Sequence, residues 1–338
     1  MFRVALKELL ARKRRLVTTG IAITLGIAFL TGTQLLSGVL NDSIESLVTS
    51  VYDRYDAIVR SPQVQETGFG QPIRGPIASS VVTEVEAVPG VAAANGVIEA
   101  QSAQLMGKDG KTLGSGFGPP TIVSNAVEDS LLQVGTYTEG DRPSADNEIA
   151  LDFATADKNG FTLGAEISVA TQDGVEKFDL VGLNGLGDEG DRTSGSVVMT
   201  FTTPTAQRLA RLTDQFSYIA VAGEPGVSQD TLAERIAVAV PAQQTLTGAE
   251  YIRETQDQIA QFVDILSTFV SVFGYIALIV AAFIIYNTFS IIVAQRSREI
   301  ALLRAIGAKR RQVLSSTLVE ATAIGLVASL IGLAVGLL

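Results

Sequence analysis

The 338-residue sequence contains no cysteine and no histidine. These absences exclude disulfide bonds, thiolate or imidazole metal ligands, thiol nucleophiles and any catalytic triad or general base that depends on histidine. An enzyme built on this chain would depend on carboxylates, lysine, tyrosine or serine. The lack of cysteine assigns no compartment, because secreted and cytosolic proteins alike can do without it.

Charge is also scarce, since 18% of the residues are charged against 47% that are hydrophobic, and the mean hydropathy is +0.33. The charged residues vanish from some long stretches and crowd the segments between them. This composition is too apolar for a disordered chain and too uneven for one soluble globule. We therefore expect membrane-spanning segments.

Three stretches without charge, 16–40, 265–295 and 321–338, are long enough to cross a bilayer at about 1.5 Å per helical residue. The first is longer than the apolar region of a signal peptide, and no cleavage site follows it, so we expect it to be retained. The third contains Gly332 and Gly336, whose spacing allows close helix packing. Because the sequence stops inside this apolar stretch, we expect the full-length protein to carry at least one further helix.

The distribution of charge predicts the orientation of these spans. Residues 1–15 contain six basic residues and one acidic residue, and residues 296–320 contain six basic and two acidic residues. Residues 41–264 contain 13 basic and 32 acidic residues, a net charge of −19. The positive-inside rule then assigns 1–15 and 296–320 to the cytoplasm and 41–264 to the outside of the plasma (inner) membrane. The acidic outer segment argues against nucleic acid as a partner.

Apolar periodicity extends beyond the spans. Residues 1–15 form either an amphipathic helix on the cytoplasmic membrane surface or a basic flank that only sets the topology. In the segment that precedes the second span, Ile252, Ile259 and Leu266 are seven residues apart, with Phe262 between them. We expect this helix and the continuation of the first span to form a paired stalk; the alternative is that each packs separately on the outer domain.

The segment between the first two spans is predicted to be an α+β domain. We expect a hairpin turn at Gln172-Asp173-Gly174. The expected helices are 81–88, 204–212 and 229–240, and the expected strands are one or two within 91–106, together with 166–171, 176–182, 196–201 and 218–222.

Two motifs in this domain resemble binding sites only superficially. Gly110-Lys111-Thr112 ends like a phosphate-binding loop, but Leu105 stands where the first glycine is required, and the tripeptide lies in a predicted hairpin. The acidic run from Gly187 to Asp191 does not have the spacing of a calcium loop. We therefore expect no nucleotide and no metal at either place.

The segment after the second span is the most specific feature of the chain. A short helix that ends at Gly307 carries Ile300, Leu303 and Ile306 among charged residues. A helix with apolar residues exposed to water either lies on the membrane or docks into a groove of a partner.

The run Arg298-Glu299-Ile300-Ala301-Leu302-Leu303-Arg304-Ala305-Ile306-Gly307-Ala308, followed by Glu320 and the Gly332/Gly336 pair, resembles the FtsX/MacB-type ABC transporter permeases. Segment 41–264 resembles their extracytoplasmic core domain, through Pro89-Gly90-Val91 and the stretch from Gly140 to Asp152. The resemblance implies a multi-pass α-helical membrane protein with a large extracytoplasmic α+β (MacB-like core) domain inserted between its first two spans.

In these permeases the matching segment is a coupling helix that sits on an ABC ATP-binding subunit. The resemblance therefore assigns ATPase contacts to Arg298, Glu299, Ile300, Leu303, Arg304, Ile306 and Gly307. It also implies that ATP and Mg are bound by the partner and that this chain is not an enzyme and holds no cofactor. Further implied partners are membrane lipid and a second permease unit, which is either another copy, a different chain or a second repeat.

These observations lead to one predicted function and one alternative. The chain is predicted to couple ATP hydrolysis by its partner to movement of the extracytoplasmic domain, for export or extraction of a substrate. The alternative is a non-transporting membrane regulator whose outer domain activates a cell-envelope hydrolase. An enzymatic outer domain is disfavoured, since no paired-carboxylate motif is visible.

Overall fold

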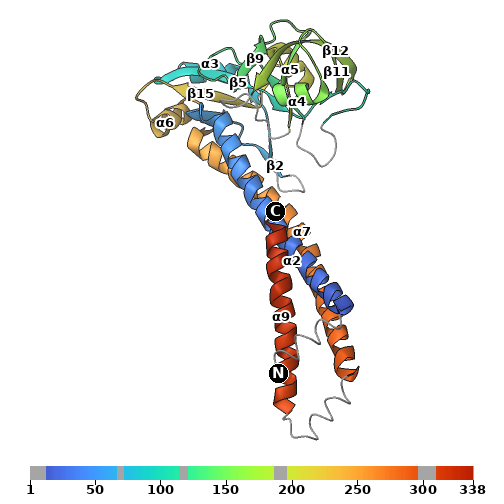
Figure 1. The fold of residues 1–338 in the computed structure, drawn as a ribbon. Helices are drawn as coiled ribbons and strands as arrows, with labels where there is room; N and C mark the ends of the chain where they lie inside the picture. The colour runs from blue at the N-terminus through green and yellow to red at the C-terminus, as the bar shows by residue number, and fades with distance from the viewer. Residues whose placement is uncertain (1–12, 67–71, 114–120, 186–195, 296–309, 338) are drawn as a thin grey trace. The chain divides into compact units, whose positions relative to one another are not determined.

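The computed structural model describes residues 13–66, 72–113, 121–185, 196–295 and 310–337 (Figure 1). The chain divides into two compact units. The α+β unit spans Ser43–Ile259, and the helical unit comprises Met1–Asp42 and Ala260–Leu338. Helices α2 (Lys13–Tyr52) and α7 (Gly248–Gln295) contribute residues to both units, and α9 (Arg310–Gly336) belongs to the helical unit.

Composition explains the three long helices. All ten prolines lie within 62–241, outside α2, α7 and α9, where a proline would remove a backbone hydrogen bond and kink the helix. Two stretches, Gly20–Val39 and Gly248–Val280, are long and apolar enough to cross a membrane, and Gly325–Gly336 is a shorter apolar helix. The prediction that helix continues beyond the first two expected spans is confirmed, because α2 extends to Tyr52 and α7 begins at Gly248.

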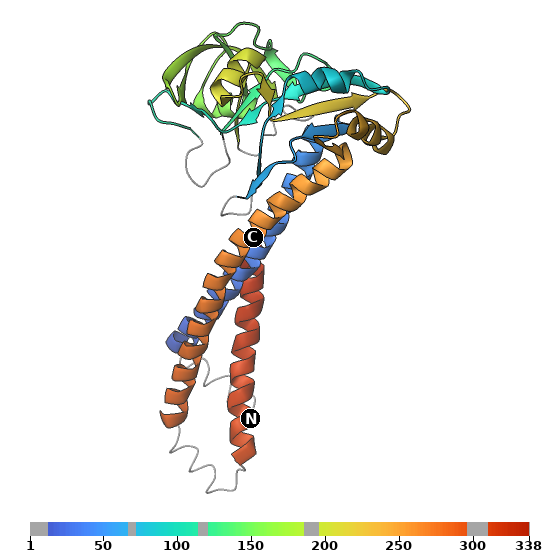
Figure 2. The ribbon, with the colours of Figure 1, turned by 180° about the vertical axis from the view of Figure 1, so that it is seen from behind.

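The smaller sheet of the α+β unit has the strand order β16-β1-β15-β5, and every neighbouring pair is antiparallel. Together with two helices it forms a β-α-β-β-α-β unit of the ferredoxin-like type, seen from two sides in Figures 1 and 2. Its elements in chain order are β1 (Ala57–Arg60), α3 (Ser80–Glu86), β5 (Val91–Val97), β15 (Tyr218–Gly223), α6 (Gln229–Ala239) and β16 (Gln244–Thr247).

The larger sheet is inserted between β5 and β15. Its strand order is β6-β8-β13-β10-β12-β11-β7, and β9 also pairs with β12. The strands are β6 (Glu99–Ala100), β7 (Gln104–Leu105), β8 (Thr121–Asn125), β9 (Thr136–Gly140), β10 (Glu148–Asp152), β11 (Glu166–Thr171), β12 (Gly174–Gly185) and β13 (Val197–Phe201). The accompanying helices are α4 (Phe153–Asn159) and α5 (Thr203–Ala210), and the two short strand pairs are β2 (Val64–Glu66) with β3 (Pro72–Arg74) and β4 (Ile77–Ala78) with β14 (Gln215–Phe216).

Most predicted elements of this unit are confirmed. Strands β11 and β12 form the predicted hairpin, with Thr171 opposite Gly174. Helix α6 begins after Ser228, whose hydroxyl accepts the amide of Thr231 as an N-cap, and α5 has Pro204 in its first turn.

The prediction of one or two strands within 91–106 is wrong, because this segment forms three strands, β5, β6 and β7. The chain changes sheets at Ile98, whose amide donates to Oδ1 of Asn125 at 2.8 Å. The amide nitrogen of the same asparagine donates to the carbonyl of Gly96 at 3.0 Å. Satisfying these backbone groups with a distant side chain lets the strand end in one sheet and resume in the other.

Side chains alternate along the strands of the smaller sheet and supply two separate cores. Ala57 and Val59 of β1 belong to the main core, together with residues of α3, α6 and the larger sheet. Ile58 belongs to a second core with Tyr55, Leu132 and Tyr218, against which Tyr52, Tyr251, Val127 and Val134 pack. The ends of α2 and α7 therefore lie on the face of the smaller sheet opposite α3 and α6.

Candidate functional site at the helix–sheet junction

The two long helices enter the smaller sheet through neighbouring strands. Helix α2 ends at Tyr52 and leads into β1, while β16 leads directly into α7 at Gly248. Strands β1 and β16 pair antiparallel with Ala57 opposite Thr247, so the start of one strand lies beside the end of the other. A movement of either helix therefore acts on the same edge of one sheet.

Gly248 is the tightest point of this junction. Its amide donates to the carbonyl of Asp56 at 2.9 Å. A Cβ atom at Gly248 would stand only 1.8 Å from the carbonyl oxygen of Tyr55. Any larger residue would push α7 away from the segment that connects α2 to β1.

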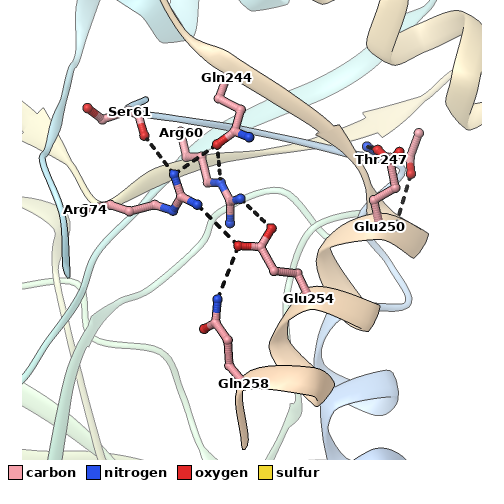
Figure 3. A network of polar contacts seen from close by, with 8 residues as sticks. All are labelled: Arg60, Ser61, Arg74, Gln244, Thr247, Glu250, Glu254 and Gln258. Carbon is pink, nitrogen blue, oxygen red and sulfur yellow. Dashed lines mark hydrogen bonds and ion pairs between the residues drawn. The ribbon is translucent and has the colours of Figure 1, made fainter. Parts of the chain in front are cut away.

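A capping box starts α7. The hydroxyl of Thr247 accepts the amide of Glu250 at 3.1 Å, and the carboxylate of Glu250 accepts the amide of Thr247 at 3.0 Å (Figure 3). This reciprocal pair satisfies donors that a helix N-terminus leaves unpaired. The T-x-x-E signal was present in the sequence at 247–250, and sequence reasoning missed it.

An ion network joins α7 to three strands. Figure 3 shows the carboxylate of Glu254 facing the guanidinium groups of both Arg60 and Arg74. Arg60 binds Oε2 of Glu254, and Arg74 Nη2 binds Oε1 at 3.2 Å. The side-chain oxygen of Gln244 accepts from both arginines, at 3.1 Å from Arg60 Nε and 2.9 Å from Arg74 Nη1. The Arg60 side chain is only 6% exposed, so without Glu254 its charge would be almost buried and unpaired.

Electrostatics holds Glu254 ionised. Partial burial raises the pKa of this carboxyl, but the hydrogen bond and charge of Arg60, together with those of Arg74, outweigh it and set the pKa below the ordinary value. Gln258 also donates to Oε1 of Glu254, at 3.2 Å. The arrangement thus ties α7 to β1, β3 and β16.

Helices α2 and α7 also contact each other directly in both units. In the α+β unit, Gln256 Nε2 donates to the carbonyl of Glu45 at 3.3 Å, and the rings of Tyr52 and Tyr251 are 5.0 Å apart. In the helical unit, the hydroxyl of Ser37 donates to that of Ser267 at 2.8 Å.

The residues expected along the stalk lie on α7, but they differ in exposure. Ile252 and Ile259 are half-buried in the α+β unit. In the helical unit, Phe262 and Leu266 are 44% and 47% exposed, whereas Val263 is 7% exposed. A role of Ile252, Ile259, Phe262 and Leu266 in a paired stalk stays a prediction.

Gly332 and Gly336 lie against α2 in the helical unit. A Cβ atom at Gly332 would stand 2.8 Å from the carbonyl oxygen of Thr24, and one at Gly336 would stand 2.7 Å from that of Ala28. The hydroxyl of Thr24 also donates to the carbonyl of Ala328 at 3.1 Å. The two glycines therefore mark where the backbones of α9 and α2 approach each other.

The expected ATPase contacts, Arg298, Glu299, Ile300, Leu303, Arg304, Ile306 and Gly307, lie outside the described residues. Residues 1–12 of segment 1–15, for which an amphipathic helix or a basic flank was expected, and the acidic run 187–191 lie outside them as well. Lys111 follows a turn at Gly110, and Met106 bridges Thr112 across it, as predicted for a hairpin. Among the residues that the structure describes, no group of three or more acidic side chains is arranged to hold a metal ion.

Two family descriptions match the chain. Residues 16–239 match the MacB-like periplasmic core domain, and residues 271–338 match the FtsX-like permease C-terminal region. The first match runs from α2 to the end of α6, and the second runs from residue 271 in α7 through α9.

Relatives with similar sequences carry matching names. An uncharacterised ABC transporter permease protein of Mycobacterium tuberculosis (strain ATCC 25618 / H37Rv) is 28% identical over 191 residues, which are 56% of this chain and 22% of that protein. One of Methanocaldococcus jannaschii is 26% identical over 168 residues, 48% of this chain and 41% of that protein. One of Mycobacterium bovis is 23% identical over 340 residues, 98% of this chain and 84% of that protein. The chain thus spans less than half the length of the first two relatives.

Two solved structures also align with the chain. The periplasmic region of MacB from Actinobacillus actinomycetemcomitans aligns with a TM-score of 0.42 at 11% identity, over 62% of this chain and 95% of that one. The extracellular domain of the ABC-type transporter YknZ from Gram-positive bacteria aligns with a TM-score of 0.40 at 11% identity, over 56% of this chain and 98% of that one.

Proposed function

This chain belongs to the FtsX-like ABC transporter permeases with a MacB-like periplasmic core domain, and we propose that it transmits the work of a separate ATP-binding subunit to that domain. The observation that carries the proposal is the junction described above. Two long helices end on neighbouring strands of one sheet, and Gly248 and Glu254 hold them there. Permeases of this family are generally non-enzymatic subunits, so the proposed role is mechanical.

The proposed topology is multi-pass. Helices α2, α7 and α9 cross the plasma (inner) membrane, with the N-terminus and residues 296–320 in the cytoplasm and residues 41–264 outside. Support comes from the apolar stretches Gly20–Val39 and Gly248–Val280 and from the separation of basic and acidic residues along the sequence. Lipid covers the exposed apolar side chains of the three helices in this arrangement.

The proposed mechanism uses α7 as the connecting element. Residues 298–307 sit on the ATP-binding subunit, which binds ATP and Mg, and Leu303 supplies an apolar contact while Glu299 supplies a polar one. A movement of this segment passes along α7, which is one continuous helix from Gly248 to Gln295. It reaches the smaller sheet through Glu254 and Gly248. The proposed assembly pairs two permease units with two ATP-binding subunits.

Capture of the partner tests this proposal. The full-length protein is purified from its membrane, and we expect an ATP-binding subunit to copurify. Leu303→Asp should release it, because a carboxylate cannot enter an apolar groove without losing its hydration. Val238→Asp is the matched control, since Val238 is 82% exposed on α6 and the same change there should leave capture intact. Failure to capture an ATP-binding subunit with the unmodified protein would contradict the proposal.

Charge reversal tests transmission separately from binding. Glu299→Lys should abolish the coupling between the permease and ATP hydrolysis in the captured complex. Membrane insertion of the variant should be retained. Glu84→Lys, on the exposed surface of α3, is the control and should behave like the unmodified chain. Normal coupling in Glu299→Lys would contradict the proposed contact. An outer domain that binds a cell-envelope hydrolase, with no export defect on deletion, would instead favour the regulatory alternative.

A further inference from the structure

The chain passes from the smaller sheet to the larger one and back at two neighbouring points. It leaves the smaller sheet at Ile98, between β5 and β6, and returns at Ser217, between β14 and β15. The segment between these two residues carries the larger sheet. Because β5 and β15 pair antiparallel with Val97 opposite Tyr218, the departing strand and the returning strand lie side by side.

Ser217 ties the two crossings together. Its amide donates to the carbonyl of Val97 at 2.9 Å. Its hydroxyl accepts the amide of Glu99 at 3.0 Å and donates to the carbonyl of Glu99 at 3.2 Å. One serine of the returning strand thus satisfies three backbone groups of the departing strand, where a continuous sheet would supply ladder partners.

Asn125 fixes the same crossing from the larger sheet. It is the last residue of β8 and is only 4% exposed. Its side-chain oxygen accepts the amide of Ile98 at 2.8 Å, and its side-chain nitrogen donates to the carbonyl of Gly96 at 3.0 Å. The same nitrogen donates to the hydroxyl of Thr203, the first residue of α5, at 3.3 Å. Movement of this side chain would leave buried backbone groups without partners, which is costly in a protein interior.

An aromatic ring lies against the backbone at the crossing. Phe216 is 9% exposed, and a Cβ atom at Gly96 would overlap its ring, so the ring packs directly on the backbone of β5. Phe216 and the fully buried Ile98 both belong to the main core, which contains residues of the two sheets. We call these residues the crossover joint: Gly96, Ile98, Asn125, Phe216 and Ser217.

We propose that the crossover joint holds the larger sheet rigidly to the smaller one, with Asn125 and Ser217 as its positioning residues. Two single strands would otherwise bend freely at the crossing, since each residue has two soft backbone dihedrals. With the joint intact, a movement of α2 and α7 that reaches the smaller sheet carries the larger sheet with it as one body. The inference rests on the proposed function for its purpose, but the rigidity itself is a property of the α+β unit.

Distance measurements between spin labels on introduced cysteines test the rigidity, and the cysteine-free sequence needs no prior substitution. The full chain in lipid nanodiscs carries labels at Ala92→Cys on β5 and Val175→Cys on β12, one on each sheet. The reference pair is Glu139→Cys on β9 with Val175→Cys, both within the larger sheet. All three positions are exposed. In the unmodified background we expect a narrow distance distribution for both pairs.

Asn125→Leu replaces the buried amide by an apolar side chain of similar shape and removes its hydrogen bonds. It should widen the distribution between the two sheets about twofold, because the backbone at the crossing regains conformational freedom. The reference pair within the larger sheet should stay unchanged. Thr203→Val is the matched control. It removes one partner of Asn125 but neither bond to the crossing, so both distributions should stay narrow.

Ser217 supplies a milder test that still decides the question if Asn125→Leu fails to fold. Ser217→Ala removes both hydroxyl contacts with Glu99 and should widen the distribution between the sheets by a smaller factor than Asn125→Leu. Ser217→Thr retains the hydroxyl and should restore the narrow distribution. Leu232→Ala truncates a fully buried side chain of α6 in the main core, away from the joint. It should lower thermal stability without widening this distribution, which separates positioning from a general loss of packing.

Two results would overturn the inference. A broad distribution between the sheets in the unmodified background would identify the crossing as a hinge, and a distribution that stays narrow in Ser217→Ala and in folded Asn125→Leu would show that the joint does not position the larger sheet. Neither measurement depends on ATP or on a partner. Failure to capture an ATP-binding subunit would therefore contradict the proposed function and leave the joint standing, whereas a hinge at the crossing would contradict the joint and leave the proposed function standing.

Discussion

The two compact units hold their helices together by different means. In the α+β unit, α2 and α7 are held by large polar and aromatic side chains, such as Glu254 with Arg60 and Tyr52 with Tyr251. In the helical unit, contacts are made where side chains are smallest. A Cβ atom at Gly274 would stand 2.5 Å from Leu30, and those at Gly332 and Gly336 would stand under 3 Å from the backbone of α2.

This difference has a physical reason. In the α+β unit, water drives apolar side chains into two cores, and charged groups at the junction keep part of their hydration. In the helical unit, large apolar side chains such as Leu25, Phe283 and Leu330 are 63% exposed or more. Under the proposed topology lipid covers them, and lipid gives helices no hydrophobic reason to associate. The close approach of helix backbones at glycines then provides the van der Waals packing that holds the helices together.

The largest expected effect is at the junction itself. Gly248→Ala should lower the free energy of unfolding of the full chain by about 3 kcal/mol, because its Cβ would overlap the carbonyl of Tyr55. Thermal unfolding followed by circular dichroism in detergent measures the loss. Gly38→Ala in α2 is the control, since nothing lies within 4 Å of its Cβ position. Equal stability of the two variants would show that α7 can shift freely at its start.

A smaller effect is expected for the ion network. Glu254→Gln should cost about 2 kcal/mol, between the values for exposed and fully buried ion pairs, since the Glu254 side chain is 32% exposed. Glu166→Gln is the control, because its pair with Lys177 is exposed on both sides, and it should cost about 0.5 kcal/mol or less. The same unfolding assay applies, and indistinguishable variants would argue that Arg60 is stabilised by Gln244 alone.

The Glu254 network also has a predicted pH dependence. The folded-state pKa of this carboxyl is lowered, so its contribution to stability is present above the ordinary glutamate pKa and is lost as the pH falls through the lowered value. Glu254→Gln should therefore remove part of the acid-induced loss of stability. Parallel acid unfolding curves for the variant and the unmodified chain would contradict this assignment.

The smallest expected effect is in the helical unit. Gly332→Ala should weaken the packing of α9 on α2 by about 1 kcal/mol, since the added Cβ would meet the Thr24 carbonyl. A disulfide between Thr24→Cys and Ala328→Cys reports the contact, and its yield should fall. Gly325→Ala on the same helix is the control, with nothing within 4 Å, and should leave the yield unchanged. An unchanged yield in Gly332→Ala would mean that the helices are held elsewhere.

Local signals in the sequence predicted much of the fold. The Gln172-Asp173-Gly174 turn and the proline at 204 each act on their own neighbours, so one sequence is enough to recognise them. The switch between sheets at Ile98 could not be found in this way. It depends on Asn125, which is 27 residues away and carries no local pattern.

The same distinction between local signals and contacts of distant residues explains how much of the candidate site could be predicted. The sequence indicated that a long helix precedes and includes the second apolar span, and α7 is continuous from Gly248 to Gln295. Glu254 pairs with Arg60 across 194 residues. Nothing in the spacing of these residues could predict their meeting.

The sequence by itself determined the apolar helices, the separation of basic and acidic segments, the α+β character of residues 41–264 and the resemblance to a permease family. Each of these depends on composition or on residues close together in the chain. The tertiary structure decided that α2 and α7 enter neighbouring strands, that Gly248 must be small, and that Glu254 lies where α7 meets three strands. These features depend on long-range strand pairing, which brings residues that are far apart in the sequence into contact. No local sequence pattern indicates such contacts.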